Sequence, residues 1–105
     1  MKTDFIVKQV TQYNDHSRYY PFKVNTSLYL FKTEIPIIPV GHPYNIDGKW
    51  YYMNFASDDE AIKVQLKQLN GYDSIEDAQM LIDQYKKAIE IKHSQEIKTI
   101  NNIKV

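Results

Sequence analysis

The pattern of hydrophobic and polar positions changes near Ala56. Before that residue, aromatic and β-branched side chains fall in short runs separated by turn residues, a pattern typical of β-strands. After it, apolar positions recur at the spacing of an α-helix. We therefore expect an α+β fold in a single domain that spans residues 1–105, with strands in residues 1–56 and two helices in residues 57–92.

The start of the chain contains two runs that predict paired strands. Residues 5–13 alternate weakly, and residues 14–17 (Asn-Asp-His-Ser) then predict a turn. Residues 18–24 alternate more clearly. Pro21 lies in the middle of this second run and cannot donate a hydrogen bond to a neighbouring strand. We therefore expect the strand over residues 18–24 to lie at a sheet edge or to carry a bulge at Pro21.

Two further strands are predicted on either side of a proline-rich connection. Residues 28–33 alternate, and residues 25–27 before them are short enough for a hairpin loop. Residues 34–47 contain three of the four prolines and should form an irregular, partly extended connection. After a turn at residues 47–48 (Asp-Gly), residues 49–55 are the most strand-like run of the chain. We expect them to form the central strand.

The first helix is predicted over residues 57–70. Ser57 followed by Glu60 matches a capping box, in which the two side chains satisfy free amides at the start of a helix. Asn70 and Gly71 then supply a stop signal. The buried stripe should consist of Ile62, Leu66 and Leu69.

Ser74 opens a second helix, with Asp77 in place of the preferred Glu or Gln. Its buried stripe should include Ile75, Ala78, Ile82, Tyr85 and Ile89. We expect this helix to end near Lys92 and residues 93–105 to form a final strand or an ordered tail. These elements predict a small antiparallel sheet of about four to five strands, covered on one face by two C-terminal α-helices.

Composition and charge restrict the classes of function. The chain has no cysteine, which excludes a disulfide scaffold, a thiol nucleophile and a metal site with thiolate ligands. Its 13 basic and 13 acidic side chains give a formal charge of zero. Residues 1–55 hold six basic and four acidic side chains, and the remainder holds seven and nine, so the strand-rich half is mildly basic. The preference for lysine over arginine indicates an AT-rich genome, such as that of a low-GC bacterium or one of its mobile elements.

No group of residues predicts catalysis. His16, His42 and His93 fall in three different segments, and no pair has the spacing of a helical metal site. The acidic run at residues 58–60 is explained by helix capping and lacks the ligand spacing of a calcium loop. The glycines are isolated, so they form no phosphate-binding loop. We expect a non-enzymatic protein with no catalytic residues, no cofactor and no metal site.

The aromatic residues carry the functional hypothesis. Ten of them lie between Tyr13 and Tyr52, and if helices cover one sheet face, only half can enter the core. Cross-strand aromatic pairs also stabilise a small sheet by themselves, which is the structural alternative for each residue. Because tyrosine and tryptophan dominate binding surfaces, we predict a binding site on the exposed sheet face. Its candidate residues are Tyr19, Tyr29, Trp50, Tyr52 and Arg18.

Two functions follow from such a face. In the first, the chain binds a protein partner stoichiometrically, as accessory and inhibitor proteins of phages and mobile elements do. In the alternative, the aromatic side chains stack on a single-stranded nucleic acid. The cations that would contact its phosphates are Lys8, Arg18, Lys23, Lys32 and Lys49. Zero net charge favours the protein partner. A homodimer is a third form of association.

We expect a cytoplasmic protein that does not contact a membrane. No segment approaches the roughly 18 consecutive apolar residues of a membrane-spanning helix. Charged residues also interrupt the first eight positions before any apolar run reaches the length of a signal-peptide core.

Overall fold

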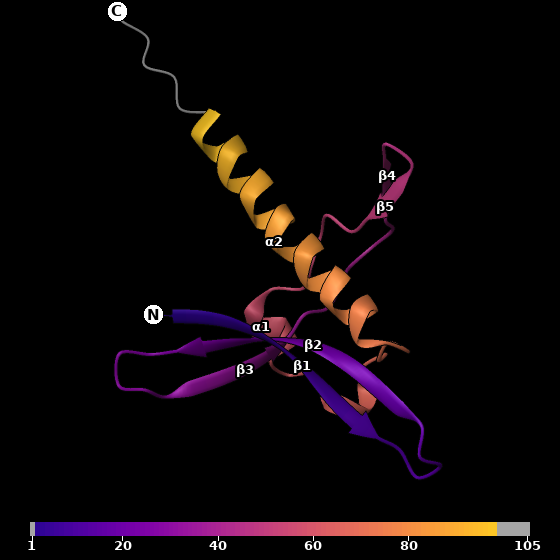
Figure 1. Ribbon diagram of the computed structural model, residues 1–105. Helices are drawn as coiled ribbons and strands as arrows, with labels where there is room; N and C mark the ends of the chain where they lie inside the picture. The colour runs from indigo at the N-terminus through magenta and orange to yellow at the C-terminus, as the bar shows by residue number, and fades with distance from the viewer. Residues whose placement is uncertain (1, 99–105) are drawn as a thin grey trace, which may run out of the picture.

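Two antiparallel sheets and one long helix make up the fold (Figure 1). The structure is a computed structural model that describes the backbone of residues 2–98 and the side chains of residues 2–92. In chain order the elements are β1 (Lys2–Thr11), β2 (Ser17–Thr26), β3 (Lys32–Pro36), β4 (Tyr44–Ile46), β5 (Lys49–Tyr51), α1 (Asp58–Ala61), the 3₁₀ turn η1 (Leu66–Gln68) and α2 (Ile75–Lys98). The predicted α+β class with antiparallel pairing is confirmed, but the strands form separate sheets of three and two.

β2 is the central strand of the three-stranded sheet, between β1 and β3. Its register with β1 is continuous through Pro21, so the prediction of an edge position or a bulge at Pro21 is wrong. The carbonyl of Pro21 faces away from β1 and accepts a hydrogen bond from the N–H of Ile37 at 3.1 Å. The reciprocal bond cannot form because proline has no N–H. β3 accordingly ends one residue before Ile37, at Pro36.

On the side of β2 that faces β3, the part beyond the end of β3 pairs with the segment around Tyr72. The N–H of Tyr19 donates to the carbonyl of Tyr72 at 2.9 Å, and the N–H of Tyr72 donates back at 2.8 Å. Gly71 lies just before this bridge. A Cβ atom at Gly71 would lie 2.8 Å from the ring of Tyr20 and 2.9 Å from Cβ of Arg18. The glycine therefore permits a close approach to β2, and it does not end a helix as predicted.

The ends of β2 and β3 differ from the predicted ones. The strands predicted over residues 5–13 and 18–24 are confirmed as β1 and β2 with shifted ends. β2 continues to Thr26, and β3 begins only at Lys32. The strand predicted over residues 28–33 is therefore wrong for its first four residues, which lie between β2 and β3.

Residues 49–55 are not the central strand. Only their first three residues form a strand, β5, which pairs with β4 in a hairpin that stands away from the three-stranded sheet (Figure 1). Asp47 and Gly48 form its turn, as predicted, with φ angles of 51° and 83° that match a type I′ turn. Beyond β5 the chain leaves the ladder, because the N–H of Tyr52 donates to the side chain of Gln84 in α2.

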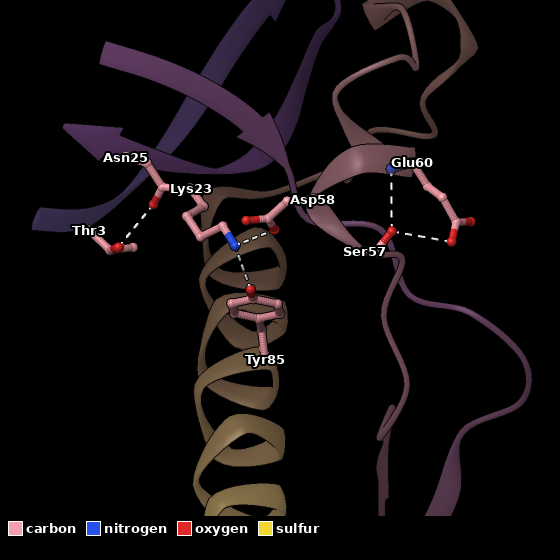
Figure 2. Close-up of polar contacts among 7 residues, drawn as sticks. All are labelled: Thr3, Lys23, Asn25, Ser57, Asp58, Glu60 and Tyr85. Carbon is pink, nitrogen blue, oxygen red and sulfur yellow. Dashed lines mark hydrogen bonds and ion pairs between the residues drawn. The ribbon is translucent and has the colours of Figure 1, made fainter. Parts of the chain in front are cut away.

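The first predicted helix is a single turn. Half of the predicted capping box is present, since the N–H of Glu60 donates to Oγ of Ser57 at 3.3 Å (Figure 2). The Glu60 carboxylate accepts a bond from the Ser57 hydroxyl at 3.2 Å, in place of the expected bond from the Ser57 N–H. After Ala61 the hydrogen bonds shorten to three-residue spacing, from Lys63 to Glu60 and from Val64 to Ala61. A β-branched residue such as Val64 also disfavours continued helix. The predicted helix is therefore wrong beyond Ala61.

The second predicted helix is confirmed at its start and wrong at its end. The N–H of Asp77 donates to Oγ of Ser74 at 3.2 Å, which caps α2 as expected. The helix continues past Lys92 to Lys98. The strand or tail predicted for residues 93–105 is thus helical in its first six residues, and the rest lies outside the described residues.

The core lies between α2 and the sheet. Ile37, Leu81 and Ile82 form its buried cluster, with Phe5, Val7, Tyr52, Phe55, Tyr72 and Tyr85 packed around it. Of the predicted stripe on α2, Ala78 and Ile82 are buried, whereas Ile75 and Ile89 are exposed. α2 contacts β1 and β2, and the short α1 contacts β3, so the predicted cover of two long helices is not found in the described residues.

We predict that Gly71→Ala destabilises the protein by about 1–3 kcal/mol, because the added methyl group overlaps the side chains of Tyr20 and Arg18. Urea denaturation followed by circular dichroism measures the effect. Asn70→Ala, at the exposed preceding position, is the matched control and should change the free energy of unfolding by less than about 0.5 kcal/mol. Equal effects of the two substitutions would contradict the close approach.

Candidate functional site

The five residues predicted to form a binding face lie in four different places. Arg18 and Tyr19 are in β2, Tyr29 is in the β2–β3 loop, Trp50 is in β5, and Tyr52 follows β5. Arg18 and Tyr19 do not share a face, because successive residues of a strand point to opposite sides of the sheet. The structure therefore does not bring the five side chains together on one sheet face.

The side chains of Arg18 and Tyr52 contact other parts of the chain. The guanidinium of Arg18 pairs with the carboxylate of Asp73 and donates to the carbonyl of Gly71 at 2.5 Å. Tyr52 packs against the buried core cluster. Both side chains therefore help to hold the fold, whereas Tyr29 and Trp50 are 83% and 63% exposed.

Among the residues whose side chains are described, the longest run of exposed apolar residues includes Tyr29. Leu28, Tyr29, Leu30 and Phe31 lie between β2 and β3 at the end of the hairpin, and we call these four residues the apolar tip. Each of their side chains is at least 74% exposed. Single apolar side chains are common on protein surfaces, whereas four consecutive exposed apolar residues are unusual.

Three hydrogen bonds define the backbone conformation of the apolar tip. The N–H of Ser27 donates to the carbonyl of Phe31 at 2.9 Å, and the N–H of Leu30 donates to the carbonyl of Ser27 at 3.0 Å. The Ser27 hydroxyl accepts a further bond from the N–H of Phe31 at 3.2 Å. This is a three-residue hairpin loop whose last residue, Leu30, has a left-handed backbone with φ of 64°.

A leucine at this position is unfavourable for the free chain. The left-handed conformation brings Cβ close to the following carbonyl and costs a residue such as leucine about 1–2 kcal/mol, whereas glycine, asparagine and aspartate adopt it readily. The side chain of Leu30 is 80% exposed, so burial within the chain does not offset this cost. The apolar tip therefore combines backbone strain with an exposed apolar surface, which is typical of a functional site.

Two lysines lie at the base of the apolar tip. Lys2 of β1 is opposite Thr26 of β2, and Thr26 is opposite Lys32 of β3. Residues in one row of register point to the same face, so the two lysine side chains lie on one side of the hairpin. Both residues are exposed. The apolar tip is therefore bordered by positive charge.

The β4–β5 hairpin carries a second, smaller group of exposed apolar residues. Trp50, Tyr44 and Ile46 are 63%, 55% and 42% exposed. Trp50 is opposite Asn45, so it points to the face opposite to Tyr44 and Ile46. Because these side chains are divided between two faces, they form no continuous apolar surface.

A buried ammonium group holds the hairpin of β2 against the helices. Nζ of Lys23 lies 2.5 Å from a carboxylate oxygen of Asp58 and 2.8 Å from the hydroxyl of Tyr85 (Figure 2). Burial lowers the pKa of Lys23, but the hydrogen bonds and charges of Asp58 and Tyr85 outweigh it, and the pKa lies above its ordinary value. One side chain thus connects β2, α1 and α2.

A cavity of about 450 Å³ lies beside β2. Tyr20, Tyr52 and Tyr72 line it together with Pro21, Pro36 and Pro39. Burial raises the pKa of Tyr72, and the charges of Tyr52 and Asp77 raise it further. The described residues that line the cavity include no Asp, Glu, Lys, Arg or His. Its walls therefore hold no group that exchanges protons near neutral pH.

Three further observations complete the description of the site. In the described part of the chain, no three side chains of His, Cys, Asp or Glu are grouped as metal ligands. No helix within residues 2–98 is long and apolar enough to cross a membrane. Comparison with models of protein families, with curated proteins and with solved structures found no match to this chain.

Sequence reasoning found only one residue of the apolar tip, Tyr29. Leu28, Leu30 and Phe31 were missed because a run of four apolar residues was read as part of a strand. Ser27 is the available signal, since a serine hydroxyl commonly closes a turn by bonding to nearby backbone.

We predict that Lys23→Met lowers the free energy of unfolding by about 1–3 kcal/mol at neutral pH, because it removes charge-assisted hydrogen bonds to Asp58 and Tyr85 while it keeps the buried aliphatic volume. The raised pKa means that folded Lys23 holds its proton more tightly than the unfolded chain does. The resulting stabilisation is complete below the ordinary pKa of 10.5 and is lost as the pH rises through the folded-state pKa.

Urea denaturation of both proteins at a series of pH values tests this prediction. The difference in the free energy of unfolding between the original protein and Lys23→Met should shrink above pH 10.5. Tyr72, whose pKa is also raised, is present in both proteins, so its titration does not contribute to this difference. Lys86→Met is the control, since Lys86 is exposed and lies over the ring of Phe5. A difference for Lys23→Met that is the same at neutral and at alkaline pH would show that the ammonium group is not the stabilising element.

Proposed function

We propose that this chain is a non-enzymatic protein-binding module whose apolar tip inserts into an apolar pocket of a partner protein. The observation that carries the proposal is Leu30, an exposed leucine on a left-handed backbone. The free chain gains nothing from leucine there. A partner that buries this side chain would gain about 1.5–3 kcal/mol, which exceeds the backbone cost.

The chemistry of the partner follows from the surroundings of the apolar tip. The tip offers two leucines and two aromatic rings, so the matching pocket is lined by apolar side chains. Lys2 and Lys32 on one side of the hairpin favour carboxylates at the rim of that pocket. Such charges guide association and orientation more than they raise affinity.

The mode of action that we propose is stoichiometric occlusion. A single protruding hairpin blocks a groove on a partner without any chemical step. The lining of the cavity beside β2, which lacks ionisable acids and bases other than tyrosine, supports this mode better than a catalytic one. It is the mode expected of a small cytoplasmic accessory or inhibitor protein of a phage or mobile element.

The alternative, binding of a single-stranded nucleic acid, has less support. Three of its five candidate cations pair with carboxylates of the same chain, in the pairs Lys8–Glu34, Arg18–Asp73 and Lys23–Asp58. Tyr52, a candidate stacking residue, packs against the core. A titration with single-stranded DNA and RNA at low salt, followed by Trp50 fluorescence, distinguishes the two functions. Salt-dependent quenching would favour the nucleic acid.

We predict that Leu30→Gly stabilises the free protein by about 1 kcal/mol, because glycine adopts the left-handed backbone without a steric cost. The same substitution should weaken binding to the partner about 10- to 100-fold, since a leucine that is buried on binding contributes about 1.5–3 kcal/mol. Affinity capture from cells of the source organism identifies the partner, and titration calorimetry with the purified pair measures the dissociation constants.

Asp15→Gly is the matched control. Asp15 has φ of 62° in the β1–β2 hairpin, and its loop has the same hydrogen bonds, from Gln12 to the His16 carbonyl and from Asp15 to the Gln12 carbonyl. This variant places glycine at the equivalent left-handed position without removing an apolar side chain. The affinity for the partner protein should therefore not change. A partner bound equally well by the Leu30→Gly protein would refute a role for the apolar tip.

A further inference from the structure

β1 leaves a ten-residue strand edge unpaired. It lies at the edge of the three-stranded sheet. In β2 the backbone N–H and C=O groups of Tyr19 and the C=O group of Pro21 face away from β1. Because these groups alternate in direction along a strand, the even-numbered residues of β2 form the backbone hydrogen bonds to β1. By the same alternation, the N–H and C=O groups of Thr3, Phe5, Val7, Gln9 and Thr11 face outward. These groups have no backbone partner among the described residues.

The charges on β1 are arranged differently from those of a protected edge. Edge strands commonly avoid pairing through charged side chains, lysine above all, through proline or through a bulge. β1 has no proline or bulge, and its charges alternate in sign along one face, with Lys2, Asp4 and Lys8. A second copy in antiparallel orientation would therefore place opposite charges against each other.

One register satisfies both charge and packing. When two copies of β1 pair antiparallel about Ile6, each Asp4 lies opposite Lys8 of the other copy and the two Ile6 residues meet. Ile6 is 36% exposed in the single chain. Asp4, Ile6 and Lys8 would occupy non-hydrogen-bonded pairs between the two copies, and in such pairs the opposed side chains lie closest. If the register shifts by two residues, Lys8 lies opposite Ile6 for a shift in one direction and opposite Lys2 for a shift in the other.

A groove beside β1 offers room for the side chains of an added strand. It has a volume of about 410 Å³ and lies between β1 and α2, with Phe5, Val7, Ile75, Ile82 and Lys86 among its lining residues. In the register about Ile6, Phe5 and Val7 of the second copy would project to the same side of the sheet as this groove.

We propose that β1 is a homodimerisation edge, at which two copies form a continuous six-stranded antiparallel sheet with both α2 helices on one face. The open edge, the meeting of the two Ile6 residues and the groove all point to a second copy of this chain. In the dimer the ammonium of Lys8 would exchange its contact with Glu34 of its own chain for Asp4 of the other copy. The dimer does not require the apolar tip, so it is independent of the proposed function.

The mass of the native protein in solution tests the dimer. Sedimentation equilibrium across micromolar to millimolar concentrations should show a species of twice 12.4 kDa. Asp4→Lys or Lys8→Glu alone should raise the dimer dissociation constant about tenfold, because each places like charges opposite one another at two symmetric positions. The double variant Asp4→Lys/Lys8→Glu should restore dimerisation, although it cannot restore the contact of Lys8 with Glu34 within the chain.

A backbone substitution provides a second test. Gln9→Pro removes an outward N–H group of β1, whereas Lys32→Pro removes one from the opposite edge of the same sheet. The first should abolish the dimer and the second should leave it unchanged, with circular dichroism confirming that both variants fold. A concentration-independent monomer would overturn the proposal. So would a dimer that survives Gln9→Pro and the single charge reversals but is lost in Leu28→Ser/Phe31→Ser.

Discussion

The arrangement of the chain depends on one missing hydrogen-bond donor, the backbone nitrogen of Pro21. Because the Pro21 carbonyl accepts a bond from Ile37 and the ring nitrogen offers none in return, the pairing of β2 with β3 ends at Pro36. Ile37 then joins the buried cluster with Leu81 and Ile82. The next part of the β2 edge stays open for Tyr72, only three residues before α2 begins. One proline thus ends a strand, sends a side chain into the core and leaves room for the segment that leads into the long helix.

Lys23, two residues along β2, provides the second connection between the sheet and the helices. A lysine in the middle of a central strand would be costly to bury alone. Here α1 supplies the carboxylate of Asp58 and α2 supplies the hydroxyl of Tyr85, so the ammonium group is bonded from two elements (Figure 2). α1 has only four residues. This bond is a clear reason for its position, because so short a helix has little apolar surface of its own to bury.

The sequence allowed prediction of elements whose signal is local. The caps at Ser57 and Ser74 and the turn at Asp47 and Gly48 lie where expected, because each depends on the chemistry of a few neighbouring residues. Predictions that required knowledge of distant partners were wrong. The run after Gly48 has high strand propensity, yet the pairing of β5 is limited to β4, since Tyr52 bonds to Gln84 from a helix more than 30 residues away. Strand propensity describes a side chain that fits a pleated surface and does not say which strand will be adjacent.

The candidate site was predicted only in part for a related reason. Alternation of large apolar residues has the same appearance in a strand and in an apolar loop, so Tyr29 was placed on a sheet face with Arg18 and Tyr52. The structure separates the three, and only Tyr29 is freely exposed.

The two long hairpins of the sheet show why the apolar tip is not explained by folding alone. Both have three-residue loops with equivalent backbone hydrogen bonds, and both place the third residue in the left-handed region. The β1–β2 loop uses Asn14 and Asp15 at its last two positions, which suit that conformation. The β2–β3 loop uses Tyr29 and Leu30 at the equivalent positions.

Sequences generally follow local rules except where function requires otherwise. The same chain follows the rule in one loop and departs from it in the other, and the departure coincides with the longest run of exposed apolar residues among the described side chains. The side chains of the apolar tip, rather than the stability of its loop, therefore account for its sequence.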